Sequence, residues 1–301
     1  MILGIDIGGT GIKFGVIADD YTIIDHCSIP TLSHRPVDEI VHDIIEKAKE
    51  LQSVFSFDRV GVGTPGDIDS ENGICNRAGN LPYNKTPLGP MISEALNLPV
   101  YIANDATAAL FGELYAGAGA AYQNIIMLTL GTGVGGGIAI DGKPHMGSKG
   151  FGGELGHMVI KYDGLPCPCG QTGCFEQYAS VTALVRQIKE AIAAHPSSLL
   201  AKICGDTPSA RDVFTAKEQG CPVANAVLEQ YTQYIAIGIN SYEAIFQPEA
   251  FIIGGAISQQ GENLLSLIRE KMRKPNTLLT SRLKNDAGII GAAIVAKIFL
   301  N

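Results

Sequence analysis

One short pattern occurs twice in the chain, and this repetition restricts the possible folds more than any other feature of the sequence. Residues 2–17 (ILGIDIGGTGIKFGVI) read as an apolar run, a glycine turn and a second apolar run, and residues 125–140 (IIMLTLGTGVGGGIAI) repeat that order. Strand, tight turn and strand is the simplest interpretation of each copy. Each copy is followed later by helices and by a strand that ends in glycine. The repeat predicts two related α/β domains that face each other, with a cleft that could hold a polyphosphate from both sides.

The first glycine turn superficially resembles a dinucleotide-binding fingerprint, but its context excludes that interpretation. Such a fingerprint requires a helix directly after the glycines, whereas the residues after Gly11 (IKFGVIA) are β-branched and too few to form one. The bare backbone N–H groups of Gly8 and Gly9 can still approach an anion, and Thr10 and Lys13 add a hydroxyl and a positive charge. An ordinary hairpin turn remains the alternative.

Two more features belong with this turn. The second copy carries Thr132 in its own glycine turn, and a later buried strand ends in the pair Gly254-Gly255, a further candidate for binding an anion.

Asn104 and Asp105 stand where a predicted strand ends and an alanine-rich helix begins. They form either an ordinary N-cap or part of a ligand site, because the carboxyl ends of strands in an α/β sheet face a ligand crevice.

A histidine and three cysteines are concentrated in one short segment, GGELGHMVIKYDGLPCPCGQTGCFE. Their spacing offers a tetrahedral nitrogen and sulfur site of the kind that zinc takes when all four ligands are protein side chains, here His157, Cys167, Cys169 and Cys174. Four protein ligands leave no open position, so the predicted zinc is structural. Glu154 and Glu176 bracket the segment.

Composition excludes several classes of protein. The 301 residues carry a net charge of −8 and no basic run, which argues against nucleic acid as a partner and favours small molecules. The N-terminus lacks a charged leader, and no apolar run reaches the roughly 20 residues that span a bilayer, so a cytoplasmic protein without a membrane partner is expected. The other four cysteines are scattered, which suits a reducing compartment better than a disulfide framework: Cys27, Cys75, Cys204 and Cys221.

Taken together, these motifs resemble the ROK family (repressor, open reading frame, kinase), and within it the glucokinase-like sugar kinases. The likeness covers essentially the whole chain, in the order IDIGGTGIK, GVGTPGDID, NLP, NDATAALFGE, TLGTGVGGGI, GGELGHMVI, CPCGQTGCFEQYAS and IIGGAIS. It implies an α/β actin-like, hexokinase-type ATPase fold of two duplicated ribonuclease-H-like domains with an interdomain cleft. The expected domains are residues 1–107 with 287–301, and residues 108–286, which contain the zinc site.

The resemblance also implies a role for each motif. Asp105 matches the catalytic base, and Asp6 matches a position that helps to hold Mg²⁺ through water. The positions that match the family's nucleotide site, for ATP, are Gly8, Gly9, Thr10, Lys13, Gly131, Thr132, Gly133, Gly254 and Gly255. Those that match its sugar site are Gly66, Asn80, Asn104, Asp105, Glu154, His157 and Glu176. Carboxylates and amides suit a sugar, because each hydroxyl both donates and accepts hydrogen bonds.

The implied reaction is transfer of the ATP γ-phosphate to the 6-hydroxyl of a hexose, and the paired Glu154 and Glu176 favour glucose. The alternatives are a kinase for N-acetylmannosamine, N-acetylglucosamine, allose, fructose or a β-glucoside. A sugar-sensing regulator needs a helix-turn-helix ahead of the first hairpin, and here that hairpin begins at Ile2. A sugar-binding protein without catalysis is disfavoured by Asp105 and the intact glycine turns. The family tends to form homodimers or homotetramers.

Overall fold

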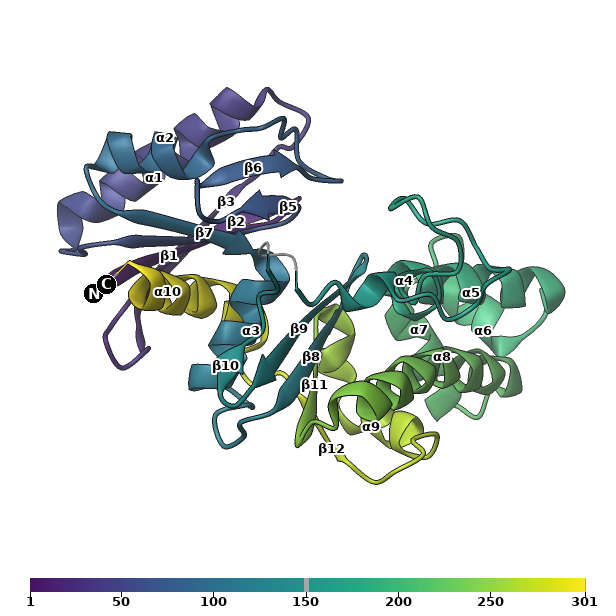
Figure 1. Ribbon diagram of the computed structural model, residues 1–301. Coiled ribbons are helices and arrows are strands. Elements are labelled where there is room, and N and C mark those ends of the chain that lie inside the picture. The colour runs from purple at the N-terminus through teal and green to yellow at the C-terminus, as the bar shows by residue number, and fades with distance from the viewer. Residues whose placement is uncertain (149–151, 301) are drawn as a thin grey trace. The chain divides into compact units, whose positions relative to one another are not determined.

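Two five-stranded sheets with the same order of strands form the framework of the chain (Figure 1). In the first sheet, β1, β2 and β3 are antiparallel neighbours, and β4 and β7 continue the sheet parallel to β1. Its order is β3 (Ile23–Pro30), β2 (Gly11–Ile17), β1 (Ile2–Ile7), β4 (Val60–Thr64) and β7 (Val100–Asn104). A separate two-stranded ribbon follows β4, formed by β5 (Asp67–Asp69) and β6 (Ile74–Arg77).

The second sheet repeats this arrangement. Its β11 is parallel to both β8 and β12, as β4 is parallel to both β1 and β7. Its order is β10 (Lys143–Pro144), β9 (Val134–Ile140), β8 (Ile125–Leu130), β11 (Ala250–Gly254) and β12 (Thr277–Thr280). The two glycine hairpins that the sequence predicts are thus β1–β2 and β8–β9. The predicted duplicated α/β fold is confirmed.

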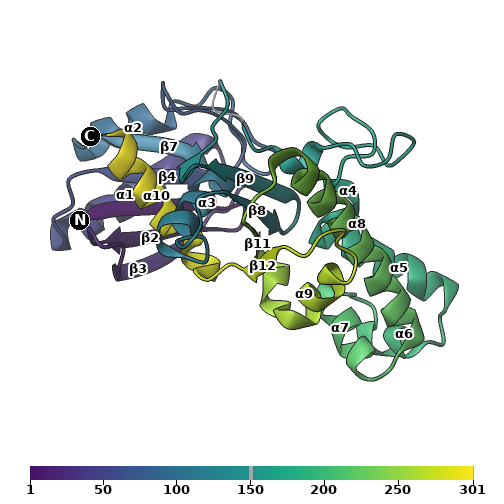
Figure 2. The same cartoon turned by 60° about the horizontal axis from the view of Figure 1, so that its bottom comes forward.

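Two pairs of helices cover the first sheet (Figures 1 and 2). Helices α1 (Val37–Val54) and α2 (Leu88–Leu96) bury their apolar sides in one core with β1, β2 and β4. On α1 the buried residues recur every three or four positions, which is the pattern of an amphipathic helix. Helices α3 (Asp105–Ala116) and α10 (Ala287–Phe299) lie side by side on the opposite face, where Phe111 and Ile289 belong to a second core.

Glycines allow α10 to approach the sheet and α3 at backbone distance. A Cβ atom on Gly4 or Gly61 would lie 2.0 or 1.8 Å from a carbonyl oxygen of α10. Where the two helices meet, a Cβ atom on Gly291 would lie 1.6 Å from the carbonyl oxygen of Ala108. Contacts this close are open only to residues without a side chain. The glycines therefore fix the C-terminal helix against the N-terminal sheet.

A buried carboxylate fastens the end of α3 to the segment that leads into α10. Glu113 is fully buried, and its Oε2 accepts hydrogen bonds from the backbone N–H groups of Ala118 and Arg282, at 2.7 and 3.1 Å. Its Oε1 accepts a third from Leu283, at 2.8 Å. Buried charge is costly unless it is hydrogen-bonded, and these three donors compensate the Glu113 carboxylate.

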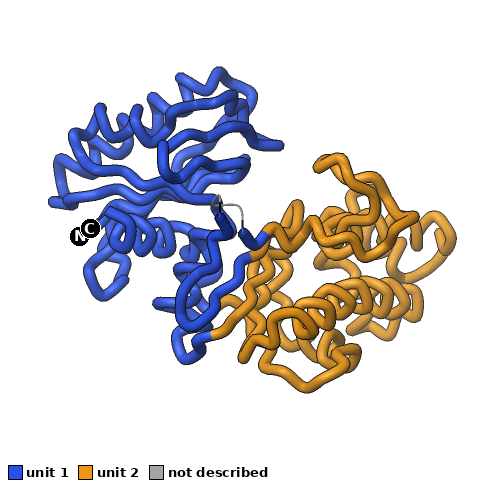
Figure 3. Tube along the Cα trace, viewed as in Figure 1, with its two compact units in different colours: residues 1–123, 137–153, 282–301 blue, residues 124–136, 154–281 orange. Residues whose placement is uncertain are grey.

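The structure, a computed structural model, describes residues 1–148 and 152–300, which divide into two compact units (Figure 3). Unit 1 comprises residues 1–123, 137–153 and 282–301, and unit 2 comprises residues 124–136 and 154–281. These units differ from the sequence-based domains, which assign residues 108–123, 137–153 and 282–286 to the second domain. The close packing of α3 on α10 accounts for the place of α3 in unit 1. As a definition of domains, the sequence-based division stays a prediction.

A long helix, α8 (Pro222–Phe246), organises unit 2. Gly238 on this helix leaves room for the ring of Phe175, because a Cβ atom there would lie 2.7 Å from Cζ of that ring. Tyr242 donates a hydrogen bond to the carbonyl oxygen of Leu155 at 2.6 Å, and Tyr231 donates one to that of Ala179 at 2.8 Å. Helix α8 thereby holds both ends of the cysteine-rich segment.

Smaller elements complete unit 2 and the connection to α10. The α-helices are α4 (Glu176–Ala179), α5 (Val181–Ala194), α6 (Leu199–Cys204), α7 (Ala210–Glu218) and α9 (Glu262–Arg269). Short 3₁₀ turns are η1 (Leu155–His157), η2 (Ala256–Gln260) and η3 (Lys284–Asp286). Among the described residues, the helices are all too short or too polar to cross a membrane.

We predict that Gly61→Ala destabilises the chain, because the added methyl group meets the α10 backbone and cannot be accommodated without moving the helix. The expected loss is about 2–3 kcal/mol in the free energy of unfolding, measured by urea denaturation. Gly79→Ala is the control, since a Cβ atom at Gly79 has nothing within 4 Å. Equal stability of the two variants would contradict the proposed packing role of Gly61.

Candidate functional site

The first glycine turn lies beside a predicted sugar-binding residue of unit 1. Between β1 and β2 the turn closes through a hydrogen bond from Gly8 N–H to the Gly11 carbonyl oxygen, at 2.9 Å. A Cβ atom on Gly9 would lie 2.8 Å from Nδ2 of Asn80. The absence of a side chain at Gly9 therefore brings Asn80 against the turn, and Thr10 is exposed next to it.

Asp6 and Lys13 face each other across the same hairpin. They are register partners on β1 and β2, and Lys13 Nζ lies 3.7 Å from Asp6 Oδ2 while donating a hydrogen bond to the Asn285 carbonyl oxygen at 2.9 Å. Burial raises the pKa of Asp6, and the Lys13 ammonium opposes that rise. Gly288 leaves space for the carboxylate, since its Cβ atom would lie 2.5 Å from Asp6 Cγ. A further cation at Asp6 would favour its ionised form.

Asn104 and Asp105 stand at the junction of β7 and α3, as the sequence predicts. Asn104 is the N-cap, and its Oδ1 accepts hydrogen bonds from the N–H groups of Ala106 and Thr107, at 2.9 and 3.4 Å. Its Nδ2 donates to the Gly66 carbonyl oxygen at 3.3 Å, which links the cap to the loop after β4. Asp105 is the first residue of α3, where the helix dipole stabilises negative charge. Both the N-cap interpretation and a ligand-facing role are compatible with this geometry.

Gly66 has a backbone conformation that few other residues adopt. Its φ is +114°, and a Cβ atom would lie 2.3 Å from the Arg77 carbonyl oxygen. The loop between β4 and β5 can therefore turn back towards Asn104 only with glycine at this position. In unit 1 the structure thus links Gly66 to Asn104, and Asn80 to Gly9.

In unit 2 the second glycine turn contacts the segment that follows the cysteines. Glu176 Oε2 accepts a hydrogen bond from Val134 N–H at 2.9 Å, and a Cβ atom on Gly133 would lie 2.3 Å from the same oxygen. The N–H group of Val181 donates to the Gly131 carbonyl oxygen at 2.8 Å. Thus Glu176, predicted to bind sugar, also anchors the turn that is predicted to bind nucleotide.

Gly254 and Gly255 lie next to the strand that leads into this turn. Gly254 ends β11 and pairs with Thr129 of β8, two residues before Gly131. Gly255 has a φ of +79°, and a Cβ atom on it would lie 2.4 Å from the Leu130 carbonyl oxygen. The predicted nucleotide-binding glycines of unit 2 are therefore gathered at one end of the β8–β11 pair.

The four predicted metal ligands converge on one point of unit 2. One ligand atom from each of His157, Cys167, Cys169 and Cys174 lies within 4.8 Å of all the others. The Sγ atoms of Cys169 and Cys174 are 3.6 Å apart, and Cys167 Sγ lies 3.7 Å from His157 Nδ1. Sulfurs bound to one tetrahedral zinc at about 2.3 Å lie about 3.7 Å from each other. The donor set and its spacing fit a closed tetrahedral metal site.

Burial and side-chain amides surround these ligands. Burial raises the pKa of the Cys174 thiol to about 12, so a metal that binds there has to displace the thiol proton. Two amides that the sequence analysis missed point at sulfur: Gln177 Nε2 lies 3.7 Å from Cys167 Sγ, and Gln171 Nε2 lies 3.9 Å from Cys169 Sγ. In the sequence, only their closeness to the cysteines could have indicated this role, since Gln171 lies between Cys169 and Cys174 and Gln177 follows Cys174.

His157 connects the metal ligands to a predicted sugar-binding residue. Its Nδ1 faces Cys167, and its Nε2 lies 3.8 Å from Glu154 Oε2. The two ring nitrogens of His157 therefore have different neighbours. The sequence alone could not say which nitrogen faces the cysteines. A metal bound at Nδ1 would fix the ring and, with it, the side of the imidazole that Glu154 approaches.

Comparison with known proteins identifies the family. The chain matches the ROK family over residues 2–298. It is 36% identical to a glucokinase of Thermotoga maritima, over 98% of this chain and 97% of that protein, and 34% identical to a glucokinase of Streptomyces coelicolor, over 99% and 98%. A ROK family glucokinase from Streptomyces griseus, solved with glucose and AMPPNP, is similar in structure, with a TM-score of 0.86 and 33% identity over 99% of both chains. The chain belongs to the ROK family, and the predicted hexokinase-type fold agrees with these neighbours.

We predict that Asn104→Ala costs about 1 kcal/mol of stability through loss of the cap on α3, as measured by urea denaturation. Asn104→Asp is the matched control, because aspartate keeps the capping oxygen and removes only the donor to Gly66. The aspartate variant should retain most of the stability that the alanine variant loses. Equal losses in both would show that the link to Gly66, and not the cap, stabilises the junction.

Proposed function

We propose that the chain is an ATP-dependent hexose kinase that transfers the γ-phosphate to a 6-hydroxyl, with glucose as its substrate. The observation that carries the proposal is the position of Asp105, ionisable and half-buried at the first turn of α3, next to Asn104, which donates a hydrogen bond to Gly66. Two further findings support it: full-length similarity to glucokinases, and structural similarity to a glucokinase that binds glucose and AMPPNP.

In the proposed reaction Asp105 is the general base. Its carboxylate accepts the proton of the sugar hydroxyl as that oxygen attacks the γ-phosphorus, and the bond between the phosphorus and the β–γ bridging oxygen breaks to release ADP. The helix dipole at the start of α3 favours the ionised form that this task requires. Asn104 holds the first turn of the helix and so orients Asp105.

The glycine turns are assigned to the nucleotide. The backbone of both turns, around Gly8 and Gly9 in unit 1 and around Gly131 and Gly133 in unit 2, can approach phosphate oxygens closely because the glycines add no side chain of their own. The N–H groups of Gly8 and Gly131 already donate within the turns, to Gly11 and Gly133. Asp6 fits a role in holding Mg²⁺ through water, since it is a partly buried carboxylate beside the Lys13 ammonium. When bound, Mg²⁺ would neutralise charge on the phosphate oxygens.

The sugar is assigned to a set of carboxylates and amides with one glycine and one imidazole: Gly66, Asn80, Asn104, Asp105, Glu154, His157 and Glu176. Residues 66–84 and 145–156 are expected to decide between glucose and the alternative sugars, and of these residues 149–151 lie outside those that the structure describes. Ranking glucose, N-acetylmannosamine, N-acetylglucosamine, allose, fructose and a β-glucoside by kcat/KM in an ATP-coupled assay separates the candidates. Turnover of any of them also distinguishes a kinase from a regulator without catalysis.

We predict that Asp105→Asn lowers kcat for glucose phosphorylation by about 10²–10⁴-fold, because an amide cannot take the hydroxyl proton. The fold should be retained, since asparagine has the same shape and also tolerates the start of a helix. The measurement is an ATP-coupled assay beside a thermal melt of each protein. Asp58→Asn, on an exposed carboxylate paired with Arg59, is the control and should keep full activity. Near-normal turnover by the Asp105 variant would reject it as the base.

We propose that the ion at His157, Cys167, Cys169 and Cys174 is zinc and that it braces the segment carrying Glu154 and Glu176. The support is the donor set of one nitrogen and three sulfurs with tetrahedral spacing. Such a brace would limit the movement of both acids relative to each other. We also propose that the protein is cytoplasmic, and the tendency of the ROK family supports a homodimer or homotetramer.

We predict about one zinc per chain in the purified protein, determined by mass spectrometry of the metal. Cys169→Ser should lose the metal, lower the melting temperature and weaken glucose binding together, because one of the four ligands is removed. Cys27→Ser is the control, since Cys27 is a partly exposed cysteine of β3 in unit 1. A wild-type protein that is purified without chelators and contains no zinc would refute the proposal.

A further inference from the structure

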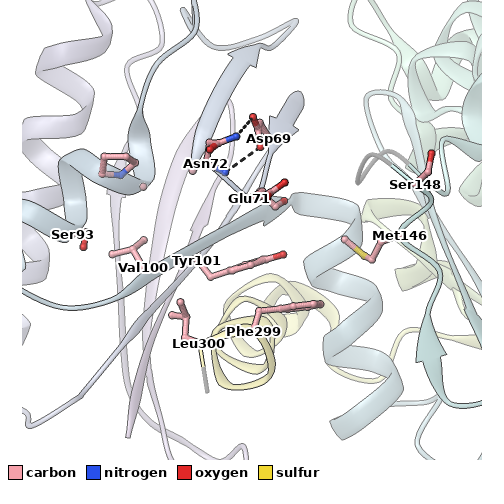
Figure 4. Close-up of a pocket in the computed structure, with 14 residues that line it drawn as sticks. Asp69, Glu71, Asn72, Ser93, Val100, Tyr101, Met146, Ser148, Phe299 and Leu300 are labelled. Atoms are coloured by element: carbon pink, nitrogen blue, oxygen red, sulfur yellow. Dashed lines mark hydrogen bonds between the residues drawn. The ribbon is translucent and has the colours of Figure 1, made fainter.

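A cavity in unit 1 is not explained by the proposed kinase reaction. It has a volume of about 670 Å³ and lies between the β5–β6 turn, the start of α2, β7, residues 146–148 and the end of α10 (Figure 4). This volume is within the range of pockets that hold small ligands, roughly 300–1,000 Å³. None of the candidate catalytic, nucleotide-binding or metal-binding residues lines it.

Two stacked aromatic rings form the apolar part of this cavity. The rings of Tyr101 and Phe299 are 4.8 Å apart and nearly parallel, with an interplanar angle of 12°. Phe299 is 44% exposed although it is a large apolar side chain near the end of α10. Val100 and Leu300 flank the pair, and Met146 lies opposite them (Figure 4). A half-buried tyrosine ring and an exposed phenylalanine ring that line a cavity suit a ligand with an apolar face.

Polar groups line the rim above the rings. The turn between β5 and β6 supplies Asp69, Glu71 and Asn72, and the Asp69 carboxylate accepts hydrogen bonds from Asn72 N–H at 3.1 Å and from Asn72 Nδ2 at 2.8 Å (Figure 4). Those bonds hold the turn in place before any ligand binds. Gly73 holds it against α2, since a Cβ atom there would lie 2.9 Å from Cδ of Pro90.

The charge of the rim excludes anionic ligands. Of the described residues that line the cavity, Asp69 and Glu71 are acidic and none is basic. A phosphate or carboxylate would be repelled by these two carboxylates, and no described residue of the lining supplies a compensating cation. Hydroxyl groups, in contrast, can donate hydrogen bonds to the carboxylates and to the serine and asparagine oxygens. A ligand with one apolar face and several uncharged hydroxyl groups fits both the aromatic pair and the polar rim of the cavity.

We propose that this cavity is a binding site for a neutral sugar of one or two rings, separate from the candidate catalytic residues. The C–H face of the sugar lies on the Tyr101–Phe299 pair, and its hydroxyls contact Glu71, Asn72 and Ser93. The site shares β7 with Asn104 and the β5–β6 ribbon with the loop of Gly66, so an occupant touches the elements that position Asp105. The proposal stands on the cavity alone and does not depend on the kinase reaction.

The experiment uses calorimetric titration of the full chain with maltose as the probe. Phe299→Ala should weaken maltose binding by about fivefold or more, because it removes half of the aromatic pair. Ile298→Ala is the matched control: this neighbour on α10 is 39% exposed and does not line the cavity. It should change the affinity by less than about twofold. Glucose 6-phosphate should not compete, because its phosphate is repelled.

Other outcomes overturn the proposal. Binding of maltose that is weakened by Glu154→Gln but not by Phe299→Ala would assign the probe to the predicted catalytic sugar site. Equal competition by glucose 6-phosphate would contradict a site for neutral ligands. A dimer in sedimentation that Phe299→Ala dissociates would show that a second copy of the chain covers the cavity. Kinase activity, measured in parallel, tests the proposed function separately.

Discussion

The backbone contact of α10 with the first sheet is the constraint on which the arrangement of unit 1 depends. Gly4 and Gly61 in the sheet and Gly291 on the helix let main chains meet where any side chain would collide. Dispersion and apolar burial at this distance are strong because many atoms come into contact at once. The same approach brings Gly288 against Asp6 and positions α3, whose first residue is Asp105. The candidate base and the candidate magnesium residue thus share one packing interface.

Unit 2 positions its polar residues differently. Here a hydrogen bond joins Glu176 to the second glycine turn, and His157 lies between Glu154 and the cysteines. Residues 158–173 contain little regular structure of their own. A structural metal could order such a segment, because its bonds to four side chains replace the hydrogen bonds of helices or strands. Long loops without secondary structure otherwise lose conformational entropy for few contacts. The proposed zinc and the anchor on α8 through Phe175 compensate for that loss.

Local patterns explain what could be predicted. The hairpins, the N-cap at Asn104 and the convergence of His157 with the three cysteines follow from short-range rules, and the structure has each of them. The predicted boundary after residue 107 falls inside α3, whereas the compact units keep all of α3 with α10, a partner that lies at the other end of the chain. Short elements such as β5, β6, α6 and β12 had no predicted counterpart, since a few residues show too little periodicity.

The sequence by itself determined the duplicated α/β pattern, the family and the identity of the candidate metal ligands, because each rests on residues close together or on motifs in a fixed order. Only the tertiary structure decided which groups meet across long separations. It brought Asn80 to Gly9, Glu176 to the turn at Gly133, and Phe299 to Tyr101 above a cavity. Such contacts depend on how whole elements pack, and the periodicity of any one segment carries no information about its distant partner.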